Sequence, residues 1–200
     1  MSEQATKQER LATLQEACLQ CKDCPLYEGR TNLVFGVGNP ESPILIIGEG
    51  PGEQEDLQGE PFVGAAGQLL DNMLQLIGLD RSKLYIANIV KCRPPRNRDP
   101  LKEEQDACSK WLEQQMDIME PEVILCLGRV SAQRMIRTDF KITQNHGKWY
   151  RRGNQRLMAI YHPSALLRDE SKRPETFADL REFRKHLREQ YPHLYEEGKA

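Results

Sequence analysis

The chain has 200 residues, of which 38% are hydrophobic and 29% are charged, a size and composition typical of one globular domain. This composition excludes a disordered chain and a collagen-like repeat, and the longest strongly apolar run, residues 44–47, is far shorter than the roughly 20 residues that cross a bilayer. The net charge of −2 argues against coating nucleic acid through bulk positive charge, although a local basic face is present at residues 91–98.

The N-terminus is polar and lacks the apolar core of a signal peptide, so we expect a cytoplasmic protein. We expect a single domain over residues 1–200, with its core at about 18–190 and a short polar tail at 191–200.

Strands and helices are predicted to alternate along the chain. A short polar helix is expected within residues 1–20, and further helices at 65–77, 101–119, 129–137 and about 175–190, the last with Phe177, Leu180, Phe183 and Leu187 toward the core. Buried strands are expected at 44–47, 84–90, 122–127 and 157–161. This order predicts an α/β fold with a central, mainly parallel four-stranded sheet flanked by helices.

Polar side chains lie at or beside the ends of three of the predicted strands. Glu49 follows the first, Asn88 comes late in the second, and His162 follows the fourth. Ligands of parallel α/β sheets bind beyond the carboxyl ends of the strands. The sequence therefore predicts a binding site formed by these three residues.

The segment GEGPGEQED, residues 48–56, is predicted to be a loop that leaves the first strand. Its glycines permit close approach of the backbone to a ligand. It lacks the Lys-Ser/Thr ending of a phosphate loop, and its carboxylates would repel a nucleoside triphosphate. An uncharged ligand or a positive transition state suits these acids better, and the alternative is a solvated acidic turn. The carboxylates in and near the loop are Glu49, Glu53, Glu55, Asp56 and Glu60.

The six cysteines are Cys18, Cys21, Cys24, Cys92, Cys108 and Cys126. Three of them fall in the run CLQCKDC, in which two C-x2-C pairs overlap, and a basic, proline-containing segment separates Cys92 from Cys108. Thiolates from these points suit either a structural zinc ion or a cubane iron–sulfur cluster, and the residues alone do not choose between them. Cys126 lies in the apolar run VILCLG, so we expect it to be a small buried hydrophobe.

Several ungapped blocks, in one order, resemble the family 4 uracil-DNA glycosylases, the iron–sulfur type. They are CKDCPLYEGRT, GEGPGEQED, GEPFVGAAGQLL, IANIVKCRPPRNRDP, GKWY and HPSALLR, between about Cys21 and about Arg168. The resemblance implies a uracil-DNA glycosylase-like fold and a structural [4Fe-4S] cluster that would brace the Arg-rich segment. The cluster ligands that it implies are Cys21, Cys24, Cys92 and Cys108, which leaves Cys18 surplus.

The resemblance also implies roles in binding a uracil that is flipped out of DNA. Phe62 would stack on the base, Asn88 would donate to O4 and accept from N3–H, and His162 would donate to O2 and stabilise the leaving anion. Glu49, Gly50 and Pro51 would complete the uracil site.

The water-activating group is left open by the resemblance, because Gly50 stands where a related class has an aspartate. We favour Glu55, with Glu49 and Asp56 as weaker candidates, each able to offset positive charge on the sugar. Leu166 and Leu167 are candidates for an apolar wedge into the duplex, or for core packing. The candidates for contacts with DNA phosphates are Lys91, Arg93, Arg96, Arg98 and Arg168.

The resemblance thus implies a base excision repair enzyme that hydrolyses uracil from DNA. We expect it not to nick the strand, because no amine nucleophile lies near a motif except Lys91, which is better placed for phosphate. We expect a nucleoid-associated monomer that binds uracil-containing DNA and no membrane, with a sliding clamp or abasic-site repair proteins as further partners. One alternative is a protein that captures uracil-DNA covalently, but such relatives have a histidine in the loop KCRPPRNRDP, which has none here. Another is an electron-transfer or zinc module built on the cysteines alone.

Overall fold

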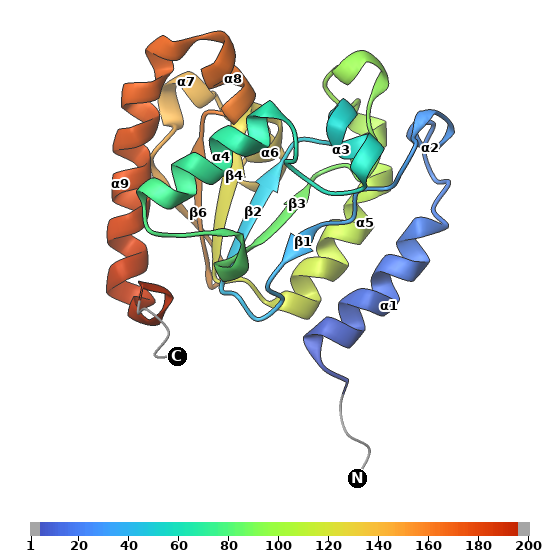
Figure 1. Cartoon of the computed structure of the whole chain (residues 1–200), viewed down its shortest axis with the longest axis horizontal. Helices are drawn as coiled ribbons and strands as arrows, with labels where there is room; N and C mark the ends of the chain where they lie inside the picture. The colour runs from blue at the N-terminus through green and yellow to red at the C-terminus, as the bar shows by residue number, and fades with distance from the viewer. Residues whose placement is uncertain (1–4, 196–200) are drawn as a thin grey trace.

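The computed structural model describes residues 5–195, in which helices surround one mixed sheet (Figure 1). The strands are β1 (Val37–Gly38), β2 (Ile44–Gly48), β3 (Tyr85–Asn88), β4 (Val123–Leu127), β5 (Trp149–Arg152) and β6 (Gln155–Ile160). The α-helices are α1 (Lys7–Leu19), α2 (Leu26–Gly29), α3 (Glu53–Gln58), α4 (Ala65–Leu76), α5 (Lys102–Met119), α6 (Gly128–Met135), α7 (Ile142–Asn145), α8 (Pro163–Arg168) and α9 (Arg173–Gln190). Short 3-10 turns are η1 (Arg81–Lys83), η2 (Pro95–Asn97), η3 (Glu170–Lys172) and η4 (Pro192–Tyr195).

The sheet has six strands in the order β1-β3-β2-β4-β6-β5. The four inner strands, which are those expected from the sequence, pair in parallel, whereas β1 and β5 add antiparallel edges. The sequence therefore predicted two strands too few. Both edge strands are short and only partly buried, so they lack the continuous apolar run that marks a buried parallel strand.

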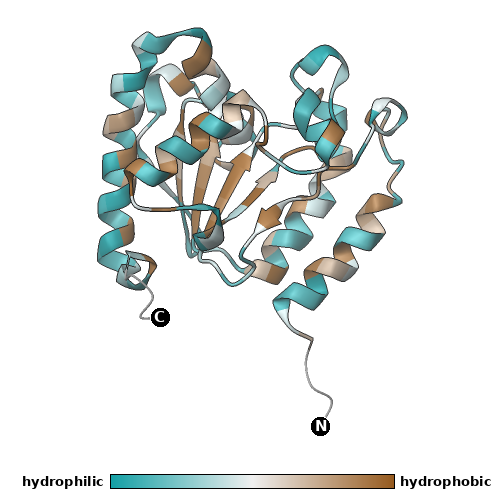
Figure 2. Ribbon diagram, in the orientation of Figure 1, coloured by the Kyte–Doolittle hydropathy of each residue, from teal (hydrophilic) through white to brown (hydrophobic). Residues whose placement is uncertain are grey.

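Helices cover both faces of the sheet, which explains the apolar runs of the inner strands. Along β2, Leu45 and Ile47 pack in one hydrophobic cluster with α1 and α5, and Ile44 and Ile46 pack in a second cluster with α4 and α9. Figure 2 shows the resulting hydrophobic sheet between helices that are hydrophilic on their outer sides. A strand that is buried on both faces is stabilised by apolar side chains pointing to either face, so its apolar residues follow one another without alternation.

The carboxyl ends of the inner strands lie along one edge of the sheet. Gly48 of β2 is paired with Asn88 of β3, and Leu127 of β4 with Ile160 of β6. The residues that follow these strands are therefore neighbours in space although they are far apart in sequence, as the strand-end argument predicts.

The segment 48–56, expected to be a loop, contains the first turn of α3. Gly52 is the N-cap of this helix, and Glu55 accepts the backbone N–H of Gly52 at 3.1 Å, as in a capping box. Acidic residues in the first turn also interact favourably with the helix dipole. The acidic residues that suggested a solvated loop are thus also those that start a helix.

Two expectations about the C-terminal part of the chain were partly wrong. In α9, Leu180, Phe183 and Leu187 are buried, but Phe177 is 37% exposed. In the expected polar tail, η4 turns back on the fold and Leu194 is buried. Residues 1–4 and 196–200, which belong to the expected N-terminal helix and tail, lie outside the described residues. Between residues 5 and 195, no helix has both the length and the hydropathy needed to span a bilayer.

Candidate active site and cysteine site

One open cavity lies at the carboxyl ends of the inner strands and has a volume of about 500 Å³. It is lined by all six residues that the family resemblance assigned to the uracil site, namely Glu49, Gly50, Pro51, Phe62, Asn88 and His162. The structure therefore brings together side chains from three strand ends and from the turn before α4.

Asn88 is the last residue of β3, and its side chain is buried at the wall of the cavity. Its Oδ1 has no hydrogen-bond partner among the described residues. Leaving a buried acceptor unpaired costs about 1–3 kcal/mol. The amide is therefore suited to accept a hydrogen bond from a ligand in the cavity.

Phe62 is held in an unusual backbone conformation, with φ at 56°. A bulky residue rarely adopts this region, and the strain costs on the order of 1–3 kcal/mol. The ring centroid lies 5.7 Å from that of His162. Gly48 permits this packing, because a Cβ there would lie 2.6 Å from the Phe62 ring and 2.3 Å from Asn88 Oδ1.

His162 is the N-cap of α8, where Nδ1 accepts the backbone N–H of Ser164 at 3.1 Å. Burial, and next the positive charge of Arg168, lower the pKa of His162 to about 4, so the ring is neutral at pH 7. A neutral imidazole has one N–H, and because Nδ1 is an acceptor here the proton belongs on Nε2. The ring therefore supplies an N–H donor without a positive charge.

Three acidic residues were weighed for activating water, and they occupy different environments. Asp56 is buried outside the cavity lining and accepts the backbone N–H of Thr31 at 2.9 Å. It holds two segments together, so its candidacy was wrong. Glu55 lines the cavity, but its carboxylate accepts three backbone N–H groups, at 3.1, 3.0 and 2.9 Å.

Glu49 is the third of these acids, and its carboxyl group belongs to a cluster of charges in the cavity lining. Burial, and next the negative charge of Asp99, raise the pKa of Glu49 to about 7, while Arg129 and Arg168 oppose this rise. The group therefore changes charge near neutral pH. Such a shifted acid in a cleft is typical of functional sites.

Two of the residues proposed to contact DNA are buried. For Lys91 this contradicts the proposed phosphate contact, and for Leu166 it favours core packing, which the sequence left open as the alternative to a wedge. Lys91 is 1% exposed, and its Nζ donates to the carbonyl oxygen of Asn88 at 3.1 Å and to Gln115 Oε1 at 2.6 Å. Leu166 is packed in the core beside α4, whereas its neighbour Leu167 is exposed. Adjacent residues of a helix face different directions, so only Leu167 is available as a wedge.

The arginines among these candidates differ in their partners. Arg96 is exposed, with φ at 55°, and Arg168 is exposed at the cavity. Arg93 lies 3.5 Å from Glu53, and Arg98 donates to the buried Glu104 at 2.6 Å. Arg96 and Arg168 are therefore better placed than Arg93 and Arg98 to contact a phosphate group of DNA.

Among the titratable residues that line the cavity, sequence reasoning missed three, Asp99, Arg129 and Tyr161. Arg129 comes two residues after the end of β4, and Tyr161 comes directly after β6. Applying the strand-end argument to every inner strand would have found both. Asp99 lies beyond η2, and no sequence signal places this loop over the cavity.

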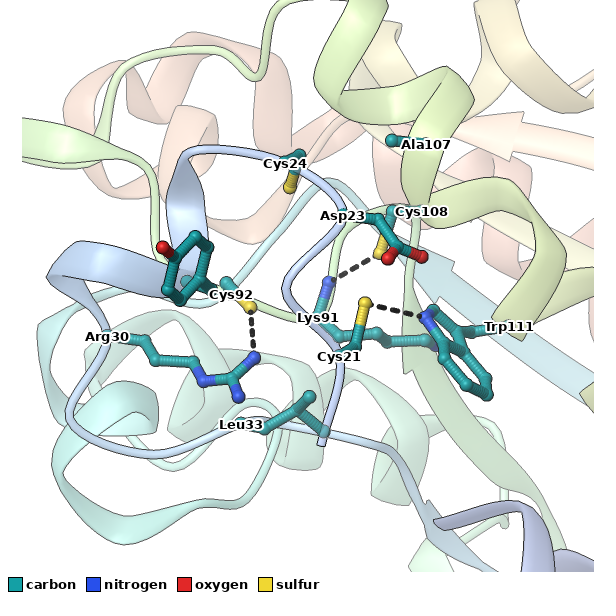
Figure 3. A pocket seen from close by; sticks show the side chains of 11 residues that line it. Cys21, Asp23, Cys24, Arg30, Leu33, Lys91, Cys92, Ala107, Cys108 and Trp111 are labelled. Carbon is teal, nitrogen blue, oxygen red and sulfur yellow. Dashed lines mark hydrogen bonds between the residues drawn. The ribbon is translucent and has the colours of Figure 1, made fainter. Parts of the chain in front are cut away.

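A second cavity is lined by the four cysteines that the resemblance selects. Cys21 and Cys24 come from the segment between α1 and α2, Cys92 follows β3, and Cys108 belongs to α5 (Figure 3). Cys18 and Cys126 are fully buried and do not line this cavity. The chain thus brings four thiols from three segments to one place.

Hydrogen-bond donors surround these thiols (Figure 3). Trp111 Nε1 donates to Cys21 Sγ at 3.3 Å, Arg30 Nη1 to Cys92 Sγ at 3.2 Å, and the backbone N–H of Lys91 to Cys108 Sγ at 3.3 Å. Such donors stabilise metal-bound thiolates. Within residues 5–195, however, no three His, Cys, Asp or Glu side chains are grouped closely enough to hold one metal ion.

Comparison with known proteins gives one family. Residues 35–191 match the model of the uracil DNA glycosylase superfamily. The chain is 42% identical to a type-4 uracil-DNA glycosylase of Archaeoglobus fulgidus, over 94% of this chain and 98% of the relative. It is 42% identical to one of Thermotoga maritima, over 83% and 88%, and 32% identical to a type-5 uracil-DNA glycosylase of Thermus thermophilus, over 66% and 68%.

Proposed function

This chain belongs to the uracil DNA glycosylase superfamily, and we propose that the cavity at its strand ends is the site where it removes uracil from DNA. The protein is a uracil-DNA glycosylase of base excision repair, which hydrolyses the N-glycosidic bond of deoxyuridine and releases uracil. The observation that carries the assignment of the site is the Asn88 amide oxygen, which has no partner among residues 5–195 and lies in the same cavity as Phe62 and His162.

Asn88 would select the base through its hydrogen-bonding pattern. Its Oδ1 accepts from N3–H of uracil while its Nδ2 donates to O4. Cytosine presents an acceptor at N3 and a donor at the 4-position, so both contacts would be lost and Asn88 Oδ1 would stay unpaired. A site built to pair with polar groups rejects strongly a ligand that lacks them.

Phe62 would stack on the face of the base, and His162 would contact the edge opposite the one that Asn88 contacts. Stacking of a base on an aromatic ring contributes about 1–3 kcal/mol. As the glycosidic bond breaks, negative charge grows on uracil, and the Nε2–H of the neutral His162 donates to O2. Removing one such donor typically lowers the rate by about 10²–10³-fold.

Positive charge develops on the sugar at the same time, and a carboxylate must offset it and orient water. The sequence favoured Glu55, but its two oxygens already accept three backbone N–H groups. We therefore place Glu49 first, because its carboxyl lies in the cavity beside Asp99 and Arg168 and titrates near neutral pH. Glu55 would hold the loop that positions Glu49.

The lining of the cavity supports hydrolysis without strand nicking. An enzyme that nicks the strand through a Schiff base needs an amine nucleophile. No lysine is among the described residues that line the cavity, and the nearby Lys91 has its ammonium turned to Gln115. We therefore propose that water, and not an amine of the protein, attacks the sugar carbon from which uracil leaves.

We propose that Cys21, Cys24, Cys92 and Cys108 hold a [4Fe-4S] cluster. The four line one cavity, and three of them accept hydrogen bonds from N–H donors. Arg30 and the buried Lys91 would balance the negative charge of a thiolate-bound cluster. When bound, the cluster supplies a cross-link between the segment after α1, the loop after β3, and α5.

Contacts with DNA would come from the rim of the cavity. Arg96 and Arg168 are exposed and suited to phosphate groups, and Leu167 is suited to fill the space that the flipped nucleotide leaves. The basic segment after β3 would thus be braced by the cluster on one side while it contacts DNA on the other.

The function is tested with a fluorescent oligonucleotide that contains one uracil, beside the same oligonucleotide with thymine. We expect release of free uracil and strand cleavage only after alkali treatment, with no release from the thymine control. Cleavage without alkali would contradict hydrolysis by water. A protein–DNA adduct that survives a denaturing gel would indicate covalent capture instead.

A further inference from the structure

One guanidinium outside the cavity holds the turn that carries Phe62. Arg81 in η1 donates from Nη1 to the carbonyl oxygen of Pro61 at 3.0 Å and from Nη2 to that of Phe62. Its Nε donates to Asp71 Oδ1 at 2.7 Å, which fixes the guanidinium to α4. We propose, on the basis of the function above, that Arg81 is a positioning residue that keeps Phe62 in the conformation that stacks on uracil.

The backbone at Phe62 needs such a support. With φ at 56°, this residue is in a region that bulky side chains avoid. Its carbonyl oxygen lies so close to α4 that a Cβ on Gly67 would come within 1.7 Å of it. A relaxed φ would turn the peptide away from Arg81 and move the ring away from Gly48 and His162. The strained turn persists because its surroundings fix it on several sides.

The geometry differs from that of an ordinary surface ion pair. The side chains of Arg81 and Asp71 are 29% and 39% exposed, and exposed pairs by themselves contribute little stability. Here the planar fork of the guanidinium serves two successive carbonyl groups and a carboxylate together. A lysine offers a single point charge and cannot reproduce this fork.

Arg81, Asp71 and Pro61 do not line the cavity, so none of them is placed to touch the base. Arg81 therefore acts on the reaction only through the position of the Phe62 ring. Its loss should weaken the binding of uracil-DNA and should have a smaller effect on the chemical step.

The kinetic test compares Arg81→Met with Arg134→Met. Arg134 is matched in residue type, in its pairing with an aspartate, and in its side-chain exposure of 29%. We expect Arg81→Met to lower kcat/KM about tenfold, mainly through a higher KM, and Arg81→Lys not to restore it. Arg134→Met should leave both constants unchanged. In a Phe62→Ala background, Arg81→Met should cause no further loss, because the ring through which it acts is gone.

A second readout follows the ring directly and does not depend on activity. Phenylalanine with a ¹³C-labelled ring is incorporated, and the signal of Phe62 is assigned by its loss in Phe62→Leu. We expect this signal to shift or broaden in Arg81→Met and to stay unchanged in Arg134→Met.

The proposal is overturned by an unchanged Phe62 signal in Arg81→Met, or by losses from Phe62→Ala and Arg81→Met that multiply. A wild-type protein that releases no uracil would overturn the proposed function instead. The ring signal would still decide whether Arg81 positions Phe62.

Discussion

Asn88 carries a cost in the folded protein that a hydrogen bond from a bound base would remove. Its buried Oδ1 has no partner among the described residues, and the cost of such an acceptor is about 1–3 kcal/mol. The substitution Asn88→Ala removes both the unpaired buried acceptor and the hydrogen bonds to the base. We expect the free energy of unfolding to stay the same or to rise, while kcat/KM for uracil-DNA falls by roughly 10²-fold or more. Urea unfolding and steady-state kinetics measure the two effects.

The control for this change is Asn145→Ala, in which an exposed amide that donates to the carbonyl oxygen of Lys141 is lost. It should leave the kinetics unchanged. Normal turnover by Asn88→Ala would contradict the assignment of this residue to base recognition. A lowered activity that merely follows a lowered stability would contradict it equally.

The pH dependence of activity separates the two candidate carboxylates. Burial and the charge of Asp99 raise the pKa of Glu49 to about 7. The charged form offsets the positive sugar, so activity should rise as the pH increases through 7 and Glu49 loses its proton. His162, with its pKa lowered to about 4, stays neutral throughout this range. We therefore expect the rise near pH 7 to belong to Glu49 alone.

Two variants test this assignment through the pH profile of kcat. Glu49→Gln should lower kcat and abolish the rise near pH 7. Glu55→Gln should keep the rise but lower the thermal stability, because the carboxylate that holds Gly52, Val63 and Gly64 is lost. If Glu55→Gln abolished the rise near pH 7 and Glu49→Gln kept it, the catalytic carboxylate would be Glu55.

At the scale of elements, the sequence predicted what depends on periodicity and on strand ends. The inner strands contain buried apolar runs because helices cover both faces of the sheet. The strand-end argument also predicted that Asn88 and His162 line one site. The edge strands β1 and β5 were missed because an edge needs no continuous apolar run. Helix α3 was missed because its acidic first turn has the composition of a solvated loop.

Lys91 shows what a linear pattern cannot supply. Four cations in eight residues favoured a phosphate contact for each of them. The burial of Lys91 depends on α5, which packs against the end of β3 and provides Gln115 as a partner. Only the packing of the two elements decides which cations of the run face outward.

The same residue links the end of β3 to the cysteine site, and this gives a prediction. The buried ammonium of Lys91 pairs with no carboxylate of the described residues, although its backbone N–H contacts Cys108. A thiolate-bound cluster at the proposed site would supply the missing negative charge. Lys91→Met keeps the volume but leaves that charge unbalanced, so we expect less iron per chain and faster bleaching of the cluster by a chelator.

The matched control for Lys91→Met is Lys110→Met. Lys110 also lies beside the site, over the ring of Trp111, but it is half-exposed and paired with Asp23. Its loss should change neither the iron content nor the bleaching rate. Equal iron content and equal bleaching in Lys91→Met and the wild type would show that Lys91 does not balance the cluster.

At the scale of the whole molecule, the chain must bind a polyanion with a net charge of −2. Much of its positive charge is used internally, as in the pairs of Arg98 with Glu104 and of Arg129 with Asp99. Binding should therefore depend on a few cations at the rim of the cavity. The salt dependence of the affinity counts them, because each phosphate contact on duplex DNA contributes about −0.9 to the slope of log K against log salt.

Arg96 is the cation of this rim whose contribution is easiest to isolate. It is exposed on η2, and it forms no ion pair with the part of the chain that the structure describes. Arg96→Ala should make the slope less steep by about 0.9 and should weaken binding of uracil-DNA and undamaged DNA equally. Arg137→Ala, which removes an arginine paired with Asp139, serves as the control and should leave the slope unchanged. An unaltered slope for Arg96→Ala would place the phosphate contacts elsewhere, and a loss confined to uracil-DNA would place Arg96 at the flipped base instead of the duplex.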